Sequence, residues 1–291
     1  PLDAKDVTCW PAHLVLTPFH VVAASASAVF VWQYRTKMSK LTSIDASAAT
    51  SLRRREGRER AFHIDDGPRP SADGADALGA RGAEPSADPI STIAASAAQL
   101  LVARESGTLL CFELPHLVLA NTCQLREHIQ YMALNSDSSR AAVVDTNGLL
   151  TLFDLSGEGG DVMVEGDDGA ARRLERKDVW QVRWAEDDQA LLAVMEKTKM
   201  VLSRDTVIEE PIPSMAHLGV LRNLEVTAVN VDRLMRDPSA VARGGSDAAS
   251  TLLARFEFAQ LREAREVVGR CGPKGPLDAA AAHVEANPHP R

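Results

Sequence analysis

Hydrophobic and polar positions alternate over short distances along the chain, most clearly near its middle. Two short apolar runs, 141–144 and 149–155, are separated there by Thr146, Asn147 and Gly148. Asn-Gly between apolar runs is a strong signal for a β-hairpin, because both residues tolerate the positive φ that a tight turn requires. A polar turn at 135–140 precedes them, so the pattern predicts three consecutive antiparallel strands.

The same combination of turn, strand and terminal aromatic ring recurs. Four ten-residue windows, 24–33, 104–113, 145–154 and 195–204, have Trp32, Phe112, Phe153 and Ser203 as their ninth residues, so the last lacks the ring. These positions are 80, 41 and 50 residues apart, and one blade of a WD-type β-propeller takes about 40–45 residues. The first spacing requires an insertion and the last a longer loop. We therefore predict successive propeller blades, the alternative being a set of unrelated hairpins.

Further strands are expected where apolar runs of strand length surround these windows. Gly107 lies in the turn of the second window, as Gly148 does in the third. The expected strands are 14–16, 20–24, 29–34 and 40–44 in the first blade, 90–95, 100–103 and 117–119 in the second, and 191–194, 200–202 and 224–231 further on.

Three polar segments interrupt this pattern. The run RRREGRER (Arg53 to Arg60) mixes both charges and is interpreted as a solvated face. The alternative for this run is a patch for an acidic partner or a nucleic acid. Segment 67–88 consists almost entirely of Gly, Ala, Pro, Ser and Asp, and segment 157–169 is acidic and rich in glycine. They bury too little apolar surface to offset the entropy of ordering, so disordered loops are expected at both places.

Two tryptophans share one predicted strand at residues 178–188. Trp180, Val182 and Trp184 alternate with Val179, Gln181 and Arg183, which is the two-residue period of a half-buried strand. We expect both indoles to pack between blades. A ligand cage is the alternative.

Helical patterns replace strands near the C-terminus. A short helix is expected at 231–236, a Gly- and Pro-containing break at 269–276 and another helix at 277–285. The domains expected are a partial propeller over 1–232 and a linker with helices over 233–291. Helical spacing from residue 252 onward is carried by Leu253, Phe256, Ala259, Leu261, Ala264, Val267 and Val268.

Composition narrows the possible functions. A net charge of −8 argues against a general binder of nucleic acid or anionic membranes. The most apolar window, 13–32, is interrupted by Pro18 and several serines, so no membrane span is expected. The chain begins with Pro1 and shows no secretory leader, and its pattern is strong from the first residues. We therefore expect a fragment of a longer protein.

Sequence motifs for chemistry are not found. The cysteines Cys9, Cys111, Cys123 and Cys271 form no C-x-x-C pair, and Cys111 is expected to be a buried apolar residue. Motifs of the G-x-S-x-G, P-loop and G-x-G-x-x-G types do not occur after a strand. The adjacent carboxylates Asp65 and Asp66 would point to opposite faces of a strand. No catalytic, cofactor-binding or metal-binding residue is expected.

Several segments in succession resemble one known family. They are LLVARESGT (100–108), LNSDSSR (134–140), GLLTLFDL (148–155), LERKDVWQVRWAEDD (174–188), MEKTKM (195–200), EEPI (209–212), VEANPHPR (284–291), REGRERAFHIDD (56–66) and FEFAQLREAR (256–265). Together they are similar to the intraflagellar transport complex A (IFT-A) subunits of the WD-repeat protein 35 type. The resemblance covers nearly the whole chain except the two low-complexity loops.

This resemblance implies a mainly β chain: later blades of a second WD40-type β-propeller, followed by the start of an α-helical TPR-like solenoid. It also implies a non-catalytic scaffold without cofactors that supports retrograde ciliary transport, ciliary entry of membrane cargo and cilium assembly. Implied partners are other IFT-A WD-repeat and solenoid subunits and, indirectly, the second train complex, dynein and membrane-receptor cargo adaptors. The implied location is the cilium, including axoneme and basal body, and the cytoplasm.

Three other functions remain open from the sequence. A vesicle-coat subunit has the same propeller and solenoid architecture. A propeller that serves as a substrate adaptor for a ligase would need a basic groove, which the acidic balance disfavours. An enzyme is the third, because propellers also host catalysis. Residues expected to have structural roles are Trp32, Gly107, Phe112, Asn147, Gly148, Phe153, Trp180 and Trp184.

Overall fold

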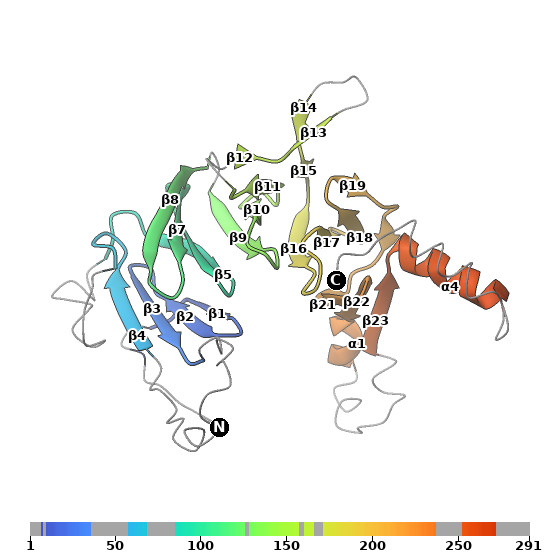
Figure 1. Cartoon of the computed structure of the whole chain (residues 1–291), viewed down its shortest axis with the longest axis horizontal. Coiled ribbons are helices and arrows are strands. Elements are labelled where there is room, and N and C mark those ends of the chain that lie inside the picture. Colours follow the sequence, from blue (N-terminus) through green and yellow to red (C-terminus); the bar gives the residue numbers. More distant parts are fainter. Residues whose placement is uncertain are drawn as a thin grey trace, which may run out of the picture. The chain divides into compact units, whose positions relative to one another are not determined.

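A computed structural model shows a mainly β chain built from consecutive antiparallel sheets (Figure 1). It describes residues 7, 10–35, 58–68, 85–125, 128–156, 160–165, 171–236 and 252–271. The chain divides into two compact units, residues 1–132 and 133–291, which are described separately. Sheets of consecutive strands are called blades here. The predicted mainly β fold class is confirmed by these sheets.

The first unit contains two four-stranded blades. Blade 1 has the order β1 (His13–Leu16), β2 (His20–Ala24), β3 (Ala28–Gln33) and β4 (Arg58–His63). Blade 2 has the order β5 (Ile90–Ala95), β6 (Gln99–Arg104), β7 (Thr108–Glu113) and β8 (Val118–Gln124). The first three strands of each blade lie where the apolar runs predicted them.

Alternate side chains of these strands form the core between blades 1 and 2. Val29 and Val31 of β3 contribute from blade 1, and Leu100, Val102 and Phe112 contribute from blade 2. The ring of Phe112 lies 5.6 Å from that of Phe62 at an interplanar angle of 59°. A two-residue period thus places one face of each blade against the next, as the alternation predicts.

The outer strand of blade 1 differs from the prediction. Residues 40–44, where it was expected, lie outside the described residues, and β4 (Arg58–His63) pairs with β3 instead. The run Arg53 to Arg60, interpreted as a solvated face, therefore ends inside a strand. There Arg60 donates a hydrogen bond to the carbonyl oxygen of His116.

Of the expected loop at 67–88 the structure describes residues 67–68 and 85–88, while residues 69–84 lie outside the described part. Ser86 donates a hydrogen bond to Asp65 Oδ1 at 3.0 Å. The Arg104 guanidinium contacts both Asp65 and Asp88, and its hydrogen bond lowers the pKa of the Asp65 carboxyl. Ser86 and Asp88 thus contact strand and turn residues of the first unit, and the disordered loop expected at 67–88 stays a prediction.

The second unit contains blades 3, 4 and 5. Strand β9 (Ile129–Leu134) spans the division between the units. Blade 3 continues with β10 (Arg140–Asp145), β11 (Leu150–Asp154) and β12 (Gly160–Asp161), and β15 (Glu175–Arg176) also pairs with β11.

Blade 4 has the order β16 (Val179–Trp184), β17 (Leu191–Glu196), β18 (Lys199–Arg204) and β19 (Val207–Ile208), and β20 (Ile212–Pro213) pairs with β18. Blade 5 has the order β21 (His217–Arg222), β22 (Glu225–Val229) and β23 (Leu253–Glu257). The helices are α1 (Val231–Arg236) and α4 (Ala259–Cys271).

The predicted Asn-Gly hairpin joins β10 to β11. The Asp145 carboxylate accepts hydrogen bonds from the backbone amides of Asn147 and Leu149, both at 2.8 Å. Gly148 has a φ of 74°, whereas Asn147 is not among the residues with positive φ. The turn is thus built on one left-handed glycine and one side-chain acceptor, and not on two left-handed residues.

Two cores join the blades of the second unit. Leu150 and Leu152 of blade 3 pack with Val182, Trp184 and Leu192 of blade 4. The opposite face of blade 4 packs against blade 5 through Met195, Met200, Leu202, Leu218, Leu221 and Phe258.

Part of the second expected loop forms strands. Within 157–169 the structure describes β12 (Gly160–Asp161) and β13 (Met163–Glu165), and β13 pairs with β14 (Ala171–Arg173). Residues 157–159 and 166–170 lie outside the described part. Residues of low apolar content join strands here because neighbouring strand edges satisfy their backbone groups.

The C-terminal predictions need three corrections. Strand β22 is the central strand of blade 5 and not its outer one, because β23 pairs with its other edge. Leu253 and Phe256 belong to β23, so the helical pattern begins only at Ala259. Helix α4 continues through residues 269–271, where a break was predicted. The last expected helix, 277–285, lies outside the described residues.

The propeller sheet extends past its expected end. β23 (Leu253–Glu257) adds to blade 5 after residue 232, where the sequence placed the boundary. The pairing of β22 with β23 extends the sheet past helix α1. A five-residue segment such as β23 is too short for its apolar spacing to distinguish a strand from a helix.

Helix α4 is capped by a residue from blade 4. The amide of Ala259, its first residue, donates to both carboxylate oxygens of Glu209 at 3.1 Å. Phe258 precedes the helix and has no side-chain acceptor, so Glu209 satisfies a donor that would otherwise lack a partner. Burial raises the pKa of Glu209, and the Ala259 hydrogen bond opposes that shift.

We expect Glu209→Ala to loosen the first turn of α4, because loss of a cap typically costs about 1 kcal/mol. Amide hydrogen exchange at residues 259–262 should accelerate by about fivefold while the blades exchange as before. Glu263→Ala removes an equally charged, exposed side chain from α4 itself and should leave these amides unchanged. Equal exchange in both variants would show that Glu209 does not cap the helix.

Candidate functional site

The first strands of blades 4 and 5 lie side by side and run in the same direction. The side-chain amide of Gln181 donates to the Leu218 carbonyl at 2.9 Å, and its oxygen accepts from the Leu218 amide at 2.8 Å. Further along, the Glu186 amide donates to the Leu221 carbonyl at 3.1 Å. The Gln181 side chain thus takes the place of a backbone hydrogen-bond partner of Leu218 and links blade 4 to blade 5.

Trp180 lies on this pair of strands but is not buried. It is 41% exposed, and its ring lies 4.9 Å from that of His217 at an angle of 72°. The prediction that both indoles pack between blades was therefore wrong for Trp180. A β-bulge between Val179 and Gln181 changes the phase of the strand, so that Val182 and Trp184 point into the core while Trp180 points out.

Similar bulges occur in the first strands of two other blades. Register shifts lie between Ile90 and Thr92 in β5 and between Leu218 and Val220 in β21. Because a bulge has no apolar signature, simple alternation predicts the wrong face for one residue of each strand. The extra residue in β16 is Trp180. The wrong face predicted for this residue therefore concerns a large aromatic side chain, which is exposed and not buried.

Trp184 has the environment that the sequence predicted. It is 6% exposed, belongs to the core between blades 3 and 4, and its indole N–H donates to the Ala133 carbonyl at 3.1 Å. A buried indole nitrogen without such a partner would be destabilising.

Trp184 also accounts for the missing ring at Ser203. In blade 4 the register aligns Trp184, Leu192 and Ser203 across three strands. In blade 2 the corresponding row is Ala95, Leu100 and Phe112. The aromatic ring of this row is thus on the third strand in blade 2, at Phe112, and on the first strand in blade 4, at Trp184. Ser203, on the third strand of blade 4, is buried.

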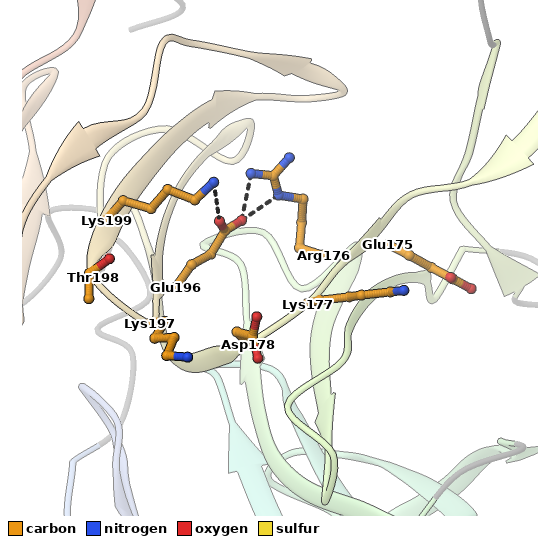
Figure 2. A pocket seen from close by; sticks show the side chains of 8 residues that line it. All are labelled: Glu175, Arg176, Lys177, Asp178, Glu196, Lys197, Thr198 and Lys199. Atoms are coloured by element: carbon orange, nitrogen blue, oxygen red, sulfur yellow. Dashed lines mark hydrogen bonds and ion pairs between the residues drawn. The ribbon is translucent and has the colours of Figure 1, made fainter.

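A charged pocket of about 400 Å³ lies at the turn end of blade 4 (Figure 2). At its centre Glu196, whose side chain is 7% exposed, accepts from Arg176 Nε at 2.6 Å and Nη2 at 2.5 Å. Lys199 Nζ lies 3.2 Å from the other Glu196 oxygen. Arg176 belongs to β15, which pairs with β11 of blade 3, so this cluster connects blade 3 to blade 4.

Three exposed charged side chains and one hydroxyl form the rim of this pocket. Lys177 and Asp178 belong to the turn before β16, and Lys197 and Thr198 form the turn between β17 and β18. The Lys197 amide donates to the Asp178 carbonyl at 2.9 Å, which holds the two turns together. Neither lysine forms an ion pair with another residue of the described part.

The other residues predicted to be structural lie in turns or in contact with a core. Phe112 and Phe153 are buried, and Trp32 is half-buried with its ring 5.9 Å from that of Tyr34. Gly107 has a φ of 84°. A Cβ added to Gly148 would lie 3.2 Å from the Val179 carbonyl oxygen, so side chains are disfavoured there.

Within the described ranges no group of three or more His, Cys, Asp or Glu residues is placed to hold a metal ion. No helix of the described part has the length and apolarity to cross a membrane. Cys111 is buried, and burial is the main factor that raises the pKa of its thiol. A raised pKa keeps this thiol protonated and therefore weakly nucleophilic.

Sequence reasoning did not find the pocket. Its buried carboxylate, Glu196, and its guanidinium, Arg176, are 20 residues apart and belong to different blades, so no local pattern joins them. The ERKD run at 175–178 and the EKTK run at 196–199 each contain both carboxylates and cationic side chains. Turns between strands of adjacent blades come together at one end of a propeller. This regularity was the sequence signal that could have placed the two charged segments in one pocket.

Comparisons with known proteins agree with this architecture. A family model described as the WDR35 second beta-propeller matches residues 1–244. WD repeat-containing protein 35 from Mus musculus is 36% identical over 291 residues, and the protein of that name from Homo sapiens is 37% identical. Both alignments cover 100% of this chain and 24% of the relative, so the chain spans about a quarter of their length.

A solved structure, described as KlHsv2 with loop 6CD replaced by a Gly-Ser linker, is similar over 77% of this chain and 63% of its own, with a TM-score of 0.45 and 12% identity. The family match rests on the sequence over residues 1–244, which include blades 1 to 4 and two strands of blade 5. The chain therefore belongs to the WDR35 second beta-propeller family.

Proposed function

We propose that this chain is part of a non-catalytic scaffold subunit of intraflagellar transport complex A. The observation that carries the proposal is the family match over residues 1–244. Its function would be to support retrograde ciliary transport, ciliary entry of membrane cargo and cilium assembly. Its location would be the cilium, including axoneme and basal body, and the cytoplasm.

The contacts between blades support a scaffold role. Blades 4 and 5 share a core and are bridged by the Gln181 amide, and Arg176 and Glu196 join blade 3 to blade 4. Such contacts keep surface loops at fixed positions, as a subunit of a polymeric assembly requires. Expected partners are other WD-repeat and solenoid subunits of the complex and, indirectly, the second train complex, dynein and cargo adaptors.

Helix α4 (Ala259–Cys271) would be the first element of a TPR-like solenoid. Its attachment to the propeller is defined by the Glu209 cap and by Phe258, which is 1% exposed in the core of blades 4 and 5. The propeller would then end near residue 258 instead of 232. In this arrangement the rigid cap sets the direction in which the solenoid leaves the propeller.

The test is purification of the tagged full-length protein from ciliated cells. Ciliary train subunits should co-purify with it, and its loss should stop retrograde movement of trains. A variant lacking residues 1–258 should be compared with the intact protein, because it separates the propeller from the solenoid. Co-purification of Golgi coat subunits instead of ciliary ones would contradict the proposal and favour the vesicle-coat alternative.

A further inference from the structure

Three chain segments meet at the turn end of blade 4 and combine exposed apolar and cationic side chains. We call the surface formed by Lys177, Trp180, Lys197, Met215 and His217 the Trp180 patch. Trp180 is 41% exposed and Met215 is 66% exposed, and Lys177, Lys197 and His217 are exposed as well. All five residues belong to the second unit.

Backbone and ring contacts make this surface continuous. The Lys197 amide donates to the Asp178 carbonyl at 2.9 Å, and the Ser214 amide donates to the Thr198 carbonyl at 3.0 Å. Trp180 then contacts His217 across the first strands of blades 4 and 5 at 4.9 Å. These contacts join 177–180, 197–198 and 214–217 into one surface next to the pocket of Figure 2.

Hydrogen bonds between the first strands of blades 4 and 5 support the patch from beneath. Gln181, which follows Trp180, forms two hydrogen bonds to Leu218, which follows His217. The two rings are therefore carried by neighbouring residues that are hydrogen-bonded to each other. A pre-organised aromatic side chain contributes to binding without a large cost in ordering entropy.

The composition of the patch is that of a protein-binding site. Tryptophan is enriched among the residues that dominate binding energy, and methionine adapts to apolar partners of varied shape. The surrounding charge favours an anionic partner. Four cations and three carboxylates line the pocket, and the buried carboxylate of Glu196 is already neutralised by Arg176 and Lys199.

Of the two other carboxylates, Glu175 lies 3.7 Å from Arg173, and Asp178 is exposed on the rim. Lys177 and Lys197 form no ion pair within the described part of the chain. With four cations and three carboxylates the lining of the pocket has a charge of +1, in a chain whose net charge is −8. The positive charge at this pocket would attract an acidic segment, whereas the negative net charge of the whole chain would repel one.

We propose that the Trp180 patch binds a short segment of a partner protein in which a large apolar side chain is flanked by carboxylates. The apolar side chain would pack on Trp180, Met215 and His217, and the carboxylates would pair with Lys177 and Lys197. The inference rests on the proposed scaffold function only in taking the partner to be a protein.

The probe for the test is a fluorescein-labelled peptide, Glu-Glu-Leu-Trp-Glu-Glu, titrated with the purified full-length protein while anisotropy is measured. Trp180→Ala should weaken binding by about 30-fold. Lys197→Glu should weaken it by about tenfold at low salt, and the difference should decrease as salt is added. A Lys-flanked peptide and a peptide with Ala-Ala at its centre should both bind poorly.

Matched controls lie elsewhere on the same unit. Val207→Ala truncates an apolar side chain that is 70% exposed on β19, and Arg222→Glu reverses an exposed charge at the far end of β21. Neither should change the affinity. Thermal unfolding of each variant should show intact protein, and Met215→Glu gives a second disruption of the patch that does not depend on Trp180.

Equal affinity of the wild-type protein for the Glu-flanked and Lys-flanked peptides would overturn the proposal. The same holds if Trp180→Ala, Met215→Glu and Lys197→Glu all bind as the wild type does. Tighter binding of single-stranded oligothymidylate, lost in the same variants, would replace the protein partner with a nucleic acid. Failure of ciliary co-purification would contradict the proposed function and leave the peptide result unaffected.

Discussion

Replacing Trp184 with alanine should destabilise the second unit by about 3–5 kcal/mol. The indole is 6% exposed and packs with Val182, Leu192 and Leu152 between blades 3 and 4. Its removal leaves a cavity, and it also leaves the Ala133 carbonyl without the donor that it has at 3.1 Å. Because domains are stable by only about 5–15 kcal/mol, this single change should remove a large part of the free energy of unfolding.

The measurement is the abundance of the full-length subunit in cells, followed by its capture and identification of the co-purifying partners. Trp184→Ala should lower abundance several-fold, with all partners lost in proportion. Trp180→Ala is a matched control, because it removes the same ring from the same strand at an exposed position. Its abundance should be that of the wild type. Normal abundance of Trp184→Ala with one partner missing would assign Trp184 to an assembly surface.

A second variant separates loss of volume from loss of the hydrogen bond. Trp184→Phe keeps most of the apolar contact but cannot donate to Ala133, and an unsatisfied buried carbonyl costs about 1–3 kcal/mol. It should therefore lie between the wild type and Trp184→Ala. Adding Ser203→Phe to Trp184→Ala returns a ring to the same row of the sheet, and partial recovery of abundance is expected.

The meander and its period were predictable because they depend on local chemistry. Asp145, Asn147 and Gly148 form a turn whose residue types are restricted by φ and by hydrogen bonding. β6 and β17 are recognisable as continuous apolar runs, because both faces of a middle strand are buried. Ser203 was recognised as an exception, but its compensation by Trp184 depends on register across three strands and is not a local property.

The predictions that were wrong involve tertiary contacts that override local preference. The bulge in β16 exposes Trp180 although the strand alternates correctly around it. β23 is a strand because β22 offers an unpaired edge, although its apolar spacing also fits a helix. The pocket residues Arg176 and Glu196 belong to different blades, and only the fold brings their charges together.

Removing the Glu196 carboxylate should be the second most damaging change. Glu196→Ala leaves Arg176, which is 23% exposed, without its partner in a largely buried position between blades 3 and 4. Breaking a buried ion pair from one side typically costs about 3–5 kcal/mol, and partial hydration of Arg176 should reduce the cost to about 2–3 kcal/mol. The shift in the midpoint of thermal or denaturant unfolding of the full-length protein measures this.

Glu175→Ala is the matched control from the same pocket. Its carboxylate is 43% exposed and lies 3.7 Å from Arg173, so its removal should change stability by less than about 0.5 kcal/mol. Replacing both partners, as in Arg176→Leu with Glu196→Leu, should be less destabilising than Glu196→Ala alone, because no charge is then left buried. If Glu196→Ala is as mild as Glu175→Ala, the ion pair does not hold blade 3 to blade 4. The packing of Leu152 against Val182 and Trp184 would then be the main connection between these blades.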